Sequence, residues 1–458
     1  MKTTIYHLKQ KIRRFTLLHL ILFCPCCCLC FSSPSYNRLT YNKIKNALTK
    51  RDFSEFFYLF ESIPDEQRVA LARIFLLKKD FAIALKILQK HDVNALSDRS
   101  LYFNIEWLYC LISIAFLSNY EEARRRLLYM QYIANTDDER SKIAFWVGLS
   151  FYKQNRRLEA LSWFEFASKI STKFYGQLAQ VFLNRILGYY NPRILHNNPT
   201  NHLILSRSTI LIRALLRQIR KVSSFLQVRH DPSAFEQLYD YYFLLNNYTE
   251  RYNLYHCGSA KYFDQNGTSS LPKLLSYPVF VPKVSDNIQN IIRMRTTQTN
   301  SDFLKTLLHA IVKEESAFRV DAKSPAGAIG LMQIMPITAR QSFQNLVRRK
   351  IIDKNSSYNS GNMYDNLILG ISHICDLIEK YDSNIILVSA AYNSGEANLD
   401  KWIRKLGMPG QHMPSFVWIE LIPFLETRNY VKKVVESFVV YSHLLKTEYL
   451  QDVLWPLF

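Results

Sequence analysis

The sequence is most constrained over residues Asp302–Gln333, where a helical pattern of apolar residues runs into a segment of turn-forming residues. On a helix with about 100° per residue, the apolar side chains of the first half form one broad stripe. Glu315 falls roughly 30° from the centre of this stripe, and Glu314 lies nearer its edge, at roughly 70°. The stripe consists of Phe303, Leu304, Leu307, Leu308, Ile311 and Val312, and the opposite face is predicted to carry Lys305, Thr306, His309 and Lys313.

Glu315 is therefore an acid on the predicted buried face of a helix. Such a group is costly unless it is paired or has a chemical role, so a structural acid and a general acid/base both remain open. The residues Ser324–Gly330 cannot extend the helix, and Leu331–Gln333 then brings apolar atoms and one amide back toward the acid. A conventional glycosidase pairs two carboxylates roughly 5 to 9 Å apart, and the sequence near Glu315 offers no obvious second one.

The whole chain has the composition of a globular, mostly helical protein. Its 458 residues leave room for roughly two to four domains. Only 12 glycines and 15 prolines argue against a β-rich or disordered chain, and 14% aromatic residues suits closely packed helices. The net charge of +20 suits an anionic partner or solubility through self-repulsion. Nucleic acid is not predicted as that partner, because the basic residues are spread along helices and no nucleic-acid-binding motif is present.

Residues 1–32 have the pattern of a secretory signal peptide. Five basic residues precede an apolar run, Phe15–Phe31, and Ser32 or Ser33 offers a small residue for cleavage. An uncleaved membrane anchor is the competing interpretation, but the run is short for a spanning helix and contains Pro25. Export with cleavage of the leader is therefore predicted.

Residues 36–284 are predicted to form a helical-repeat domain, an α-α superhelix. Three stretches resemble one another, and their alanines, Ala84, Ala123 and Ala160, are spaced by 39 and 37 residues. Each alanine follows a polar stretch and precedes further apolar residues, as in stacked helix pairs in which a small residue lets the partner helix approach. An irregular helical bundle is the alternative. Turn-forming residues gather between residues 190 and 285, which predicts a domain boundary there.

Residues 285–446 are predicted to form a second, mostly helical domain. A loop-rich interval is expected near residues 319–331. Helices are predicted at residues 364–380, at residues 384–393 with Gly395 as the C-cap, and at residues 429–444.

Four sequence blocks of this second domain resemble, in the same order, those of the soluble lytic murein transglycosylases. The residues Trp146–Gly176 likewise resemble the helical-repeat region that precedes the catalytic domain in the large members of that family. Four blocks in order are a far more specific signal than any one of them. The blocks are Glu315–Phe318 (ESAF), Ser324–Pro336 (SPAGAIGLMQIMP), Ala390–Gly395 (AAYNSG) and Trp418–Val431 (WIELIPFLETRNYV).

The resemblance implies a lysozyme-like α+β catalytic domain over residues 285–446, mostly helical with a small β element, that acts on peptidoglycan. Glu315 would be the single catalytic acid, protonating the glycosidic oxygen between N-acetylmuramic acid and N-acetylglucosamine. It would then act as base while the muramyl 6-hydroxyl closes a 1,6-anhydro ring, so no water is consumed and neither a metal nor a cofactor is implied. Burial against the apolar stripe and Leu331–Met332 is expected to raise the pKa of Glu315, as a proton donor near neutral pH requires.

The resemblance also implies which residues line the substrate groove. Ser324 and Gln333 would hydrogen-bond sugar amides or the acid, and Tyr392 would hold the geometry near Glu315. A structural role is the alternative for each, such as a surface amide for Gln333 or a core aromatic for Tyr392. The residues implied to bind substrate are Ser324, Met332, Gln333, Tyr392, Asn393 and Glu420.

Two rival functions accompany the predicted lytic transglycosylase. One is a muramidase of the same fold that admits water and hydrolyses the bond, and the other is a non-catalytic wall-binding scaffold. The predicted location is the periplasm, with the protein membrane-anchored if the leader is not cleaved. The predicted partners are peptidoglycan glycan strands and, through the helical repeats, cell-wall or division proteins.

Overall fold

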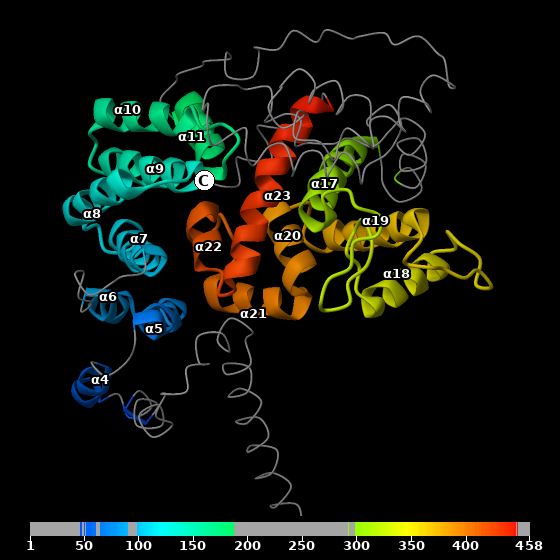
Figure 1. Ribbon diagram of the computed structural model, residues 1–458, viewed down its shortest axis with the longest axis horizontal. Coiled ribbons are helices and arrows are strands. Elements are labelled where there is room, and N and C mark those ends of the chain that lie inside the picture. The colour runs from blue at the N-terminus through cyan, green and yellow to red at the C-terminus, as the bar shows by residue number, and fades with distance from the viewer. Residues whose placement is uncertain are drawn as a thin grey trace, which may run out of the picture. The chain divides into compact units, whose positions relative to one another are not determined.

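The computed structural model of the chain describes residues 46–47, 50, 52–60, 65–89, 99–186, 292, 298–445 and 447, drawn as ribbons in Figure 1. Over these residues the chain is mostly helical, and no helix there is long and apolar enough to cross a membrane. The predicted leader, residues 1–32, and the predicted boundary segment, residues 190–285, lie outside the described residues.

The chain divides into two compact units. The first comprises residues 1–167 and 401–428, and the second comprises residues 168–400 and 429–458. By their contacts, residues 401–428 therefore belong with the N-terminal helices, although the sequence places them in the C-terminal domain.

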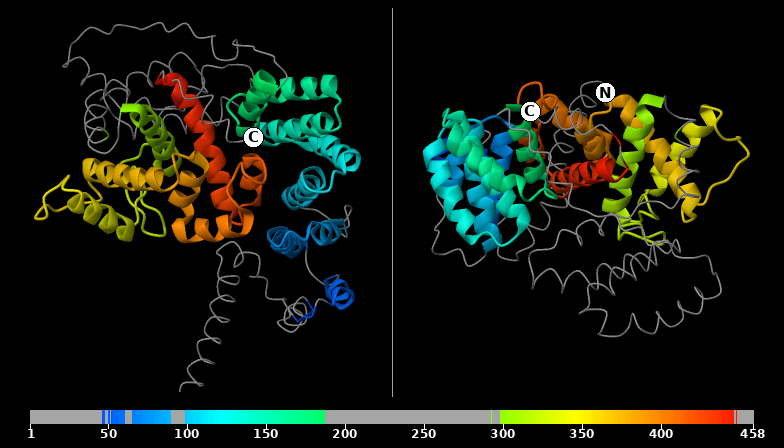
Figure 2. Two further views of the ribbon diagram at one scale, coloured as in Figure 1. Left: turned by 180° about the vertical axis from the view of Figure 1, so that it is seen from behind. Right: turned by 90° about the horizontal axis from the view of Figure 1, so that it is seen from above.

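The first unit is a stack of helices with a repeating turn, and Figures 1 and 2 show α5 to α10 following one another along it. Lys79, Ser118 and Asn155 have positive φ angles of 64°, 55° and 60°. Each stands two residues before a helix, and the intervals between them equal those between the three alanines of the sequence repeat, which are fully buried. The recurring left-handed turn confirms the predicted helical repeat. The helices are α4 (Phe53–Phe60), α5 (Asp65–Leu77), α6 (Phe81–Gln89), α7 (Arg99–Ala115), α8 (Tyr120–Ile133), α9 (Asp137–Lys153), α10 (Arg157–Ser168) and α22 (Ser415–Leu421), with α21 (Glu396–Leu406) crossing from the second unit.

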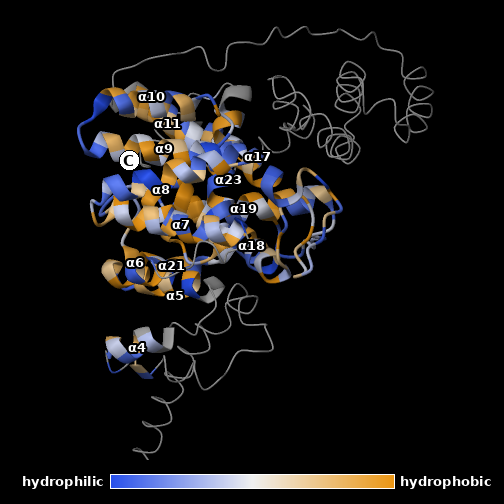
Figure 3. Ribbon diagram, turned by 60° about the vertical axis from the view of Figure 1, so that its left-hand side comes forward, coloured by the Kyte–Doolittle hydropathy of each residue, from blue (hydrophilic) through white to orange (hydrophobic). Residues whose placement is uncertain are grey.

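Aromatic side chains fill the centre of the first unit. The rings of Trp107 on α7 and Trp146 on α9 meet edge to face, with centroids 5.3 Å apart. Phe416 on α22 packs in the same way against Trp146, at 5.7 Å, and against Phe145, at 5.4 Å. Edge-to-face pairs of buried rings add to the free energy of apolar burial, so they bind α22 to the helical stack. Figure 3 shows hydrophobic and hydrophilic stretches alternating along these helices, as expected of helices that pack on one face.

The second unit is built around a buried helix, α17 (Gln298–Ser316). The sequence predicted one buried face and one polar face for this helix. The prediction of the polar face is partly wrong. Thr306 and His309 are buried, because Thr306 bonds to Thr447 at 3.0 Å and the His309 ring lies 5.3 Å from that of Tyr441 on α23. The other helices of this unit are α11 (Phe174–Ile186), α18 (Pro336–Arg348), α19 (Met363–Lys380), α20 (Ile385–Ser394) and α23 (Leu425–Leu444), which begins in the first unit.

The helix ends of the second unit follow from local sequence. Asn362 and Asn384 cap α19 and α20, each accepting two backbone N–H groups with its side-chain oxygen. Gly395, with φ of 80°, is the predicted C-cap of α20, and its N–H donates to Ala391. Two isolated antiparallel bridges, Lys323–Ile329 and Ile329–Ile334, form the small β element. The predicted fold class, mostly helical with a helical repeat and a small β element, is confirmed.

Candidate active site

Glu315 lies in the last turn of α17 and is half-buried. The helix stops directly after it, because Ala317 and Phe318 have left-handed φ angles of 49° and 64°. For a bulky side chain such as Phe318 this conformation is strained, and it persists only where the surroundings hold it. Phe318 is buried, with its ring 6.3 Å from that of His309, and this packing holds the chain in the turn that presents Glu315.

The loop after α17 is held by its own polar groups. The Ser324 hydroxyl accepts the Ala328 N–H at 2.9 Å, and the two residues also share a backbone hydrogen bond of 3.0 Å. Gln333 donates its side-chain amide to the carbonyls of Ala322, at 3.0 Å, and Gly330, at 2.8 Å. The Ser324 proton and the Gln333 carbonyl oxygen are the parts of these side chains that the loop does not use. Both residues are half-buried, so the predicted substrate-binding role is physically open to each.

Met332 lies in the core. It is fully buried, and its side chain fills the space beside Gly370 on α19, where an added Cβ would lie 2.6 Å from its Cγ. Its N–H donates to the buried Asn366 amide oxygen at 2.8 Å, while the Asn366 nitrogen donates to Ile329 at 2.9 Å. The structure therefore favours a packing role for Met332 over direct contact with substrate.

Tyr392 joins the loop to α20. Its hydroxyl donates to the Met332 carbonyl at 2.7 Å. Burial raises the pKa of Tyr392 well above its ordinary value, and the nearby charge of Glu315 raises it further. Tyr392 thus stays neutral at neutral pH and lies close to Glu315, as predicted. The neighbouring residue Asn393 is half-buried in the last turn of α20.

Tyr430 on α23 is a site residue that the sequence interpretation did not single out. It is buried, and burial followed by the charge of Glu315 raises its pKa well above the ordinary value. Its hydroxyl interacts with the Glu315 carboxylate but forms no hydrogen bond of standard geometry. Two protonated tyrosines therefore flank Glu315. The position of Tyr430 in the fourth sequence block was the available signal.

His373 on α19 was also not predicted. Its ring centroid lies 5.4 Å from that of Tyr392. Burial lowers the pKa of His373, although Glu396 and Asp376 oppose the shift. The neutral ring of His373 therefore packs against the ring of Tyr392.

Glu314 is distinguished from Glu315 by its partners. The Lys313 ammonium lies 2.8 Å from its carboxylate, and the Ser437 hydroxyl donates to it at 2.7 Å. Burial alone would raise the pKa of Glu314, but the charge and hydrogen bond of Lys313, with the bond from Ser437, lower it overall. Glu314 is thus held as an anion and is unsuited to donate a proton, which agrees with the predicted choice of Glu315.

Glu420 belongs to the first unit and is 1% exposed. Its carboxylate accepts from the Trp107 indole at 3.3 Å, and the Lys142 ammonium lies 3.9 Å away. The same ammonium stands 3.7 Å from the centre of the Trp107 ring. These contacts argue against direct binding of substrate by Glu420. In the part of the chain that the structure describes, no group of three or more His, Cys, Asp or Glu side chains is arranged to hold a metal ion.

Comparisons with known proteins agree with this arrangement. Residues 292–411 match the family model of the transglycosylase SLT domain. Soluble lytic murein transglycosylases of Salmonella typhimurium and Escherichia coli are 33% identical over 156 residues and 37% identical over 139 residues, which cover 34% and 30% of this chain. The matches cover only 23% and 20% of those proteins' own lengths.

The fold extends further than the sequence match. The X-ray structure of an inactive mutant of lytic transglycosylase Slt from Pseudomonas aeruginosa resembles the chain with a TM-score of 0.59 at 22% identity. The likeness covers 89% of this chain and 62% of that one. A helical repeat joined to a lysozyme-like domain is thus the class of fold. Residues 292–411 thus match the transglycosylase SLT domain, and the similarity to soluble lytic murein transglycosylases agrees with the resemblance of the sequence blocks.

Proposed function

We propose that the protein is a lytic transglycosylase that cleaves the β-1,4 bond between N-acetylmuramic acid and N-acetylglucosamine in peptidoglycan. The observation that carries the proposal is the setting of Glu315. It is a half-buried acid inside an SLT domain, and it lies beside two tyrosines that keep their protons. Glu314, its neighbour, is held as an anion by Lys313.

In the proposed reaction Glu315 begins protonated and gives its proton to the glycosidic oxygen as the bond from that oxygen to the muramyl C1 breaks. The resulting carboxylate takes the proton of the muramyl 6-hydroxyl while that oxygen bonds to C1. The products are a 1,6-anhydro-muramyl end and a free sugar hydroxyl, and Glu315 recovers its proton without consuming water. The substrate's own N-acetyl group would share the developing positive charge, so one carboxylate suffices.

The supporting residues follow from the loop geometry. Ser324 and Gln333 would use the proton and the carbonyl oxygen that the loop leaves available to bind sugar amides. Tyr392 would hold the loop through its hydrogen bond to the Met332 carbonyl, and its hydroxyl would stay uncharged near Glu315. Asn393 would line the same groove from α20.

The proposal includes where the protein works. An exported protein in the periplasm, released by cleavage after the predicted leader of residues 1–32, would meet peptidoglycan strands as its substrate. The full chain has a net charge of +20, and loss of the five basic residues of the leader leaves +15 (20 minus 5), which favours contact with an anionic polymer. Cell-wall or division proteins remain the proposed partners of the helical repeat, and fractionation of cells that express the tagged full chain tests the location.

The direct test is product analysis. The purified chain is incubated with peptidoglycan sacculi, and the released muropeptides are analysed by mass spectrometry. We expect 1,6-anhydro-muramyl ends, which are lighter by one water than hydrolytic products. Reducing ends without anhydro products would instead identify a hydrolytic muramidase. Binding to sacculi without any release would identify a non-catalytic scaffold.

A further inference from the structure

One face of α19 supports the loop of the candidate active site. Asn366, Gly370 and His373 stand four and three residues apart, so they lie on the same side of the helix. Asn366 bonds to the Met332 N–H at 2.8 Å, and Gly370 leaves the space that the Met332 side chain fills. The His373 ring lies 5.4 Å from that of Tyr392, whose hydroxyl donates to the Met332 carbonyl at 2.7 Å. Of these three supports, only His373 can gain a proton near neutral pH.

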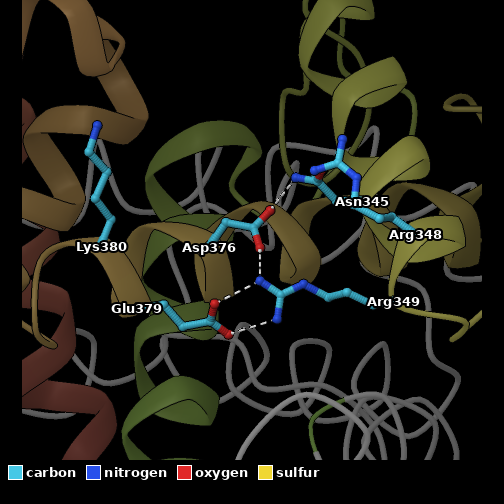
Figure 4. Close-up of a pocket in the computed structure, with 6 residues that line it drawn as sticks. All are labelled: Asn345, Arg348, Arg349, Asp376, Glu379 and Lys380. Carbon is cyan, nitrogen blue, oxygen red and sulfur yellow. Dashed lines mark hydrogen bonds and ion pairs between the residues drawn. The ribbon is translucent and has the colours of Figure 1, made fainter.

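The His373 ring stands where a positive charge is poorly compensated. The carboxylates of Asp376 on α19 and Glu396 on α21 act on the ring and favour its charged form. Both acids are already paired with cations. Figure 4 shows Asp376 joined to Arg349, at 3.2 Å. Glu396 lies 2.5 Å from the Lys380 ammonium. Burial outweighs the two acids, so the pKa of His373 lies below its ordinary value.

Tyr392 is the third titratable group beside the ring, and it stays protonated at neutral pH. The two rings therefore meet as neutral groups, with 42° between their planes. His373 is half-buried, so water reaches it and a proton can bind as the pH falls. A buried cation keeps its desolvation cost unless the ring turns toward water. Protonation of His373 thus works against the ring contact that supports Tyr392.

A second titrating group changes the pH profile of the proposed reaction. Glu315 begins the cycle protonated, so it alone predicts activity that falls as the pH rises and stays level as the pH falls. Loss of the support for Tyr392 would loosen the loop that carries Ser324 and Gln333. A fall in activity on the acid side, the acid limb of the profile, therefore requires a group such as His373.

We propose that His373 is a positioning residue that acts on the active-site loop through Tyr392, and that its protonation produces the acid limb of the pH profile. The neutral ring holds Tyr392 in place, and the charged ring gives up that contact. The inference rests on the proposed function. It adds a residue that lies outside all four sequence blocks and that touches neither the acid nor the substrate.

The test compares pH profiles of kcat for the release of muropeptides by the full chain, from about pH 4 to about pH 8. In the wild-type chain kcat should fall roughly tenfold per pH unit below the pKa of His373, as for one essential proton. His373→Phe keeps a ring against Tyr392 but cannot be protonated, so its kcat should stay level on the acid side. His373→Gln also removes the ring. Its kcat should be lower at every pH, with KM little changed and no acid limb.

His412→Gln is the matched control, since His412 is an exposed histidine of the first unit. This variant should keep the acid limb of the wild-type chain. Circular dichroism at each pH shows the range over which every variant stays folded, and the profiles are compared within that range. An acid limb of wild-type size in His373→Phe, or a wild-type profile that stays level toward acid pH, overturns the inference.

A measurement that does not depend on the reaction separates this inference from the proposed function. The methyl signal of Met332, assigned with Met332→Leu, reports on the loop in NMR spectra of the full chain with labelled methionine methyl groups. The signal should move with pH as His373 titrates in the wild-type chain and should stay in place in His373→Phe. A signal that responds in neither protein, or equally in both, would refute the positioning role. A chain that releases no anhydro products but still shows the difference would refute only the proposed reaction.

Discussion

Glu315 and Glu420 are two carboxylic acids in sequence blocks that resemble those of one family, and their surroundings differ. Glu420, 1% exposed in the first unit, has the ammonium of Lys142 and the indole N–H of Trp107 as partners. Glu315, half-buried in the second unit, lies beside two tyrosines that stay neutral at neutral pH. A nearby cation stabilises a carboxylate anion, which favours a structural role for Glu420. The two tyrosines near Glu315 carry no charge at neutral pH, which supports the proton-transfer role that we propose for this acid.

The largest expected effect is that of Glu315→Gln. It removes the only proposed proton donor while preserving shape, so release of anhydro-muropeptides should fall by roughly 10³-fold. Thermal unfolding of the variant should stay close to that of the wild-type chain. Glu314→Gln is the matched neighbour and should retain far more activity, because Lys313 holds Glu314 as an anion. Equal loss in the two variants would show that the acid has been misassigned.

Glu420→Ala should act on stability. Removing the carboxylate deletes one shared partner of Lys142 and the Trp107 N–H in a buried cluster, and we expect a loss of about 3 kcal/mol in the free energy of unfolding. Urea denaturation measures this loss. Glu159→Ala removes an exposed, ion-paired glutamate from the same unit and should change stability much less. A stable Glu420→Ala chain with a strongly raised KM for glycan would restore the predicted substrate-binding role.

Asn366→Ala tests how the second unit holds the loop beside Glu315. Asn366 is buried and bonds to the Met332 N–H at 2.8 Å and to the carbonyls of Ile329 and Ser360, both at 2.9 Å. Losing these bonds should cost about 2 kcal/mol of stability and lower kcat, since the loop carries Ser324 and Gln333. Asn366→Asp keeps the acceptor for Met332 and is the informative control. Wild-type stability and activity in Asn366→Ala would mean that the loop is held by other contacts.

The smallest effect concerns acid stability. Burial lowers the pKa of His309 from 6.5 to about 4. The folded chain keeps this ring neutral while the unfolded chain binds a proton below pH 6.5, so stability is present above that pH and is lost as the pH falls toward 4. Between pH 7 and pH 5 the wild-type chain should lose about 2 kcal/mol more than His309→Gln, in urea titrations at each pH. Parallel losses in the two proteins would contradict the buried neutral ring.

Sequence reasoning proposed Glu315 as the catalytic acid, which stays a prediction, but it could not predict the partners of the other site residues. Helical phase placed Glu315 nearer the centre of the apolar face than Glu314, and the structure adds a separate distinction, the pairing of Glu314 with Lys313. The same phase argument placed Thr306 and His309 on a polar face, where the structure buries them. A helical wheel considers one helix by itself. It could not predict this burial, because Tyr441 and Thr447, which contact His309 and Thr306, come from a distant part of the chain. Substrate binding by Met332 and Glu420 was inferred from the family resemblance. Such a resemblance identifies matching positions in the sequence, but it does not show which side chains surround them in space.

The sequence by itself determined the local features of this protein. These are the helical repeat with its spaced alanines, the stop of α17 after Glu315, the asparagine caps of α19 and α20, and the glycine that ends α20. Each depends on propensities and hydrogen bonds within a few residues. Only the tertiary structure decided that Tyr430 approaches Glu315 and that Lys142 approaches Glu420. Charge, burial and pKa depend on distances in space, and residues far apart in the chain set those distances.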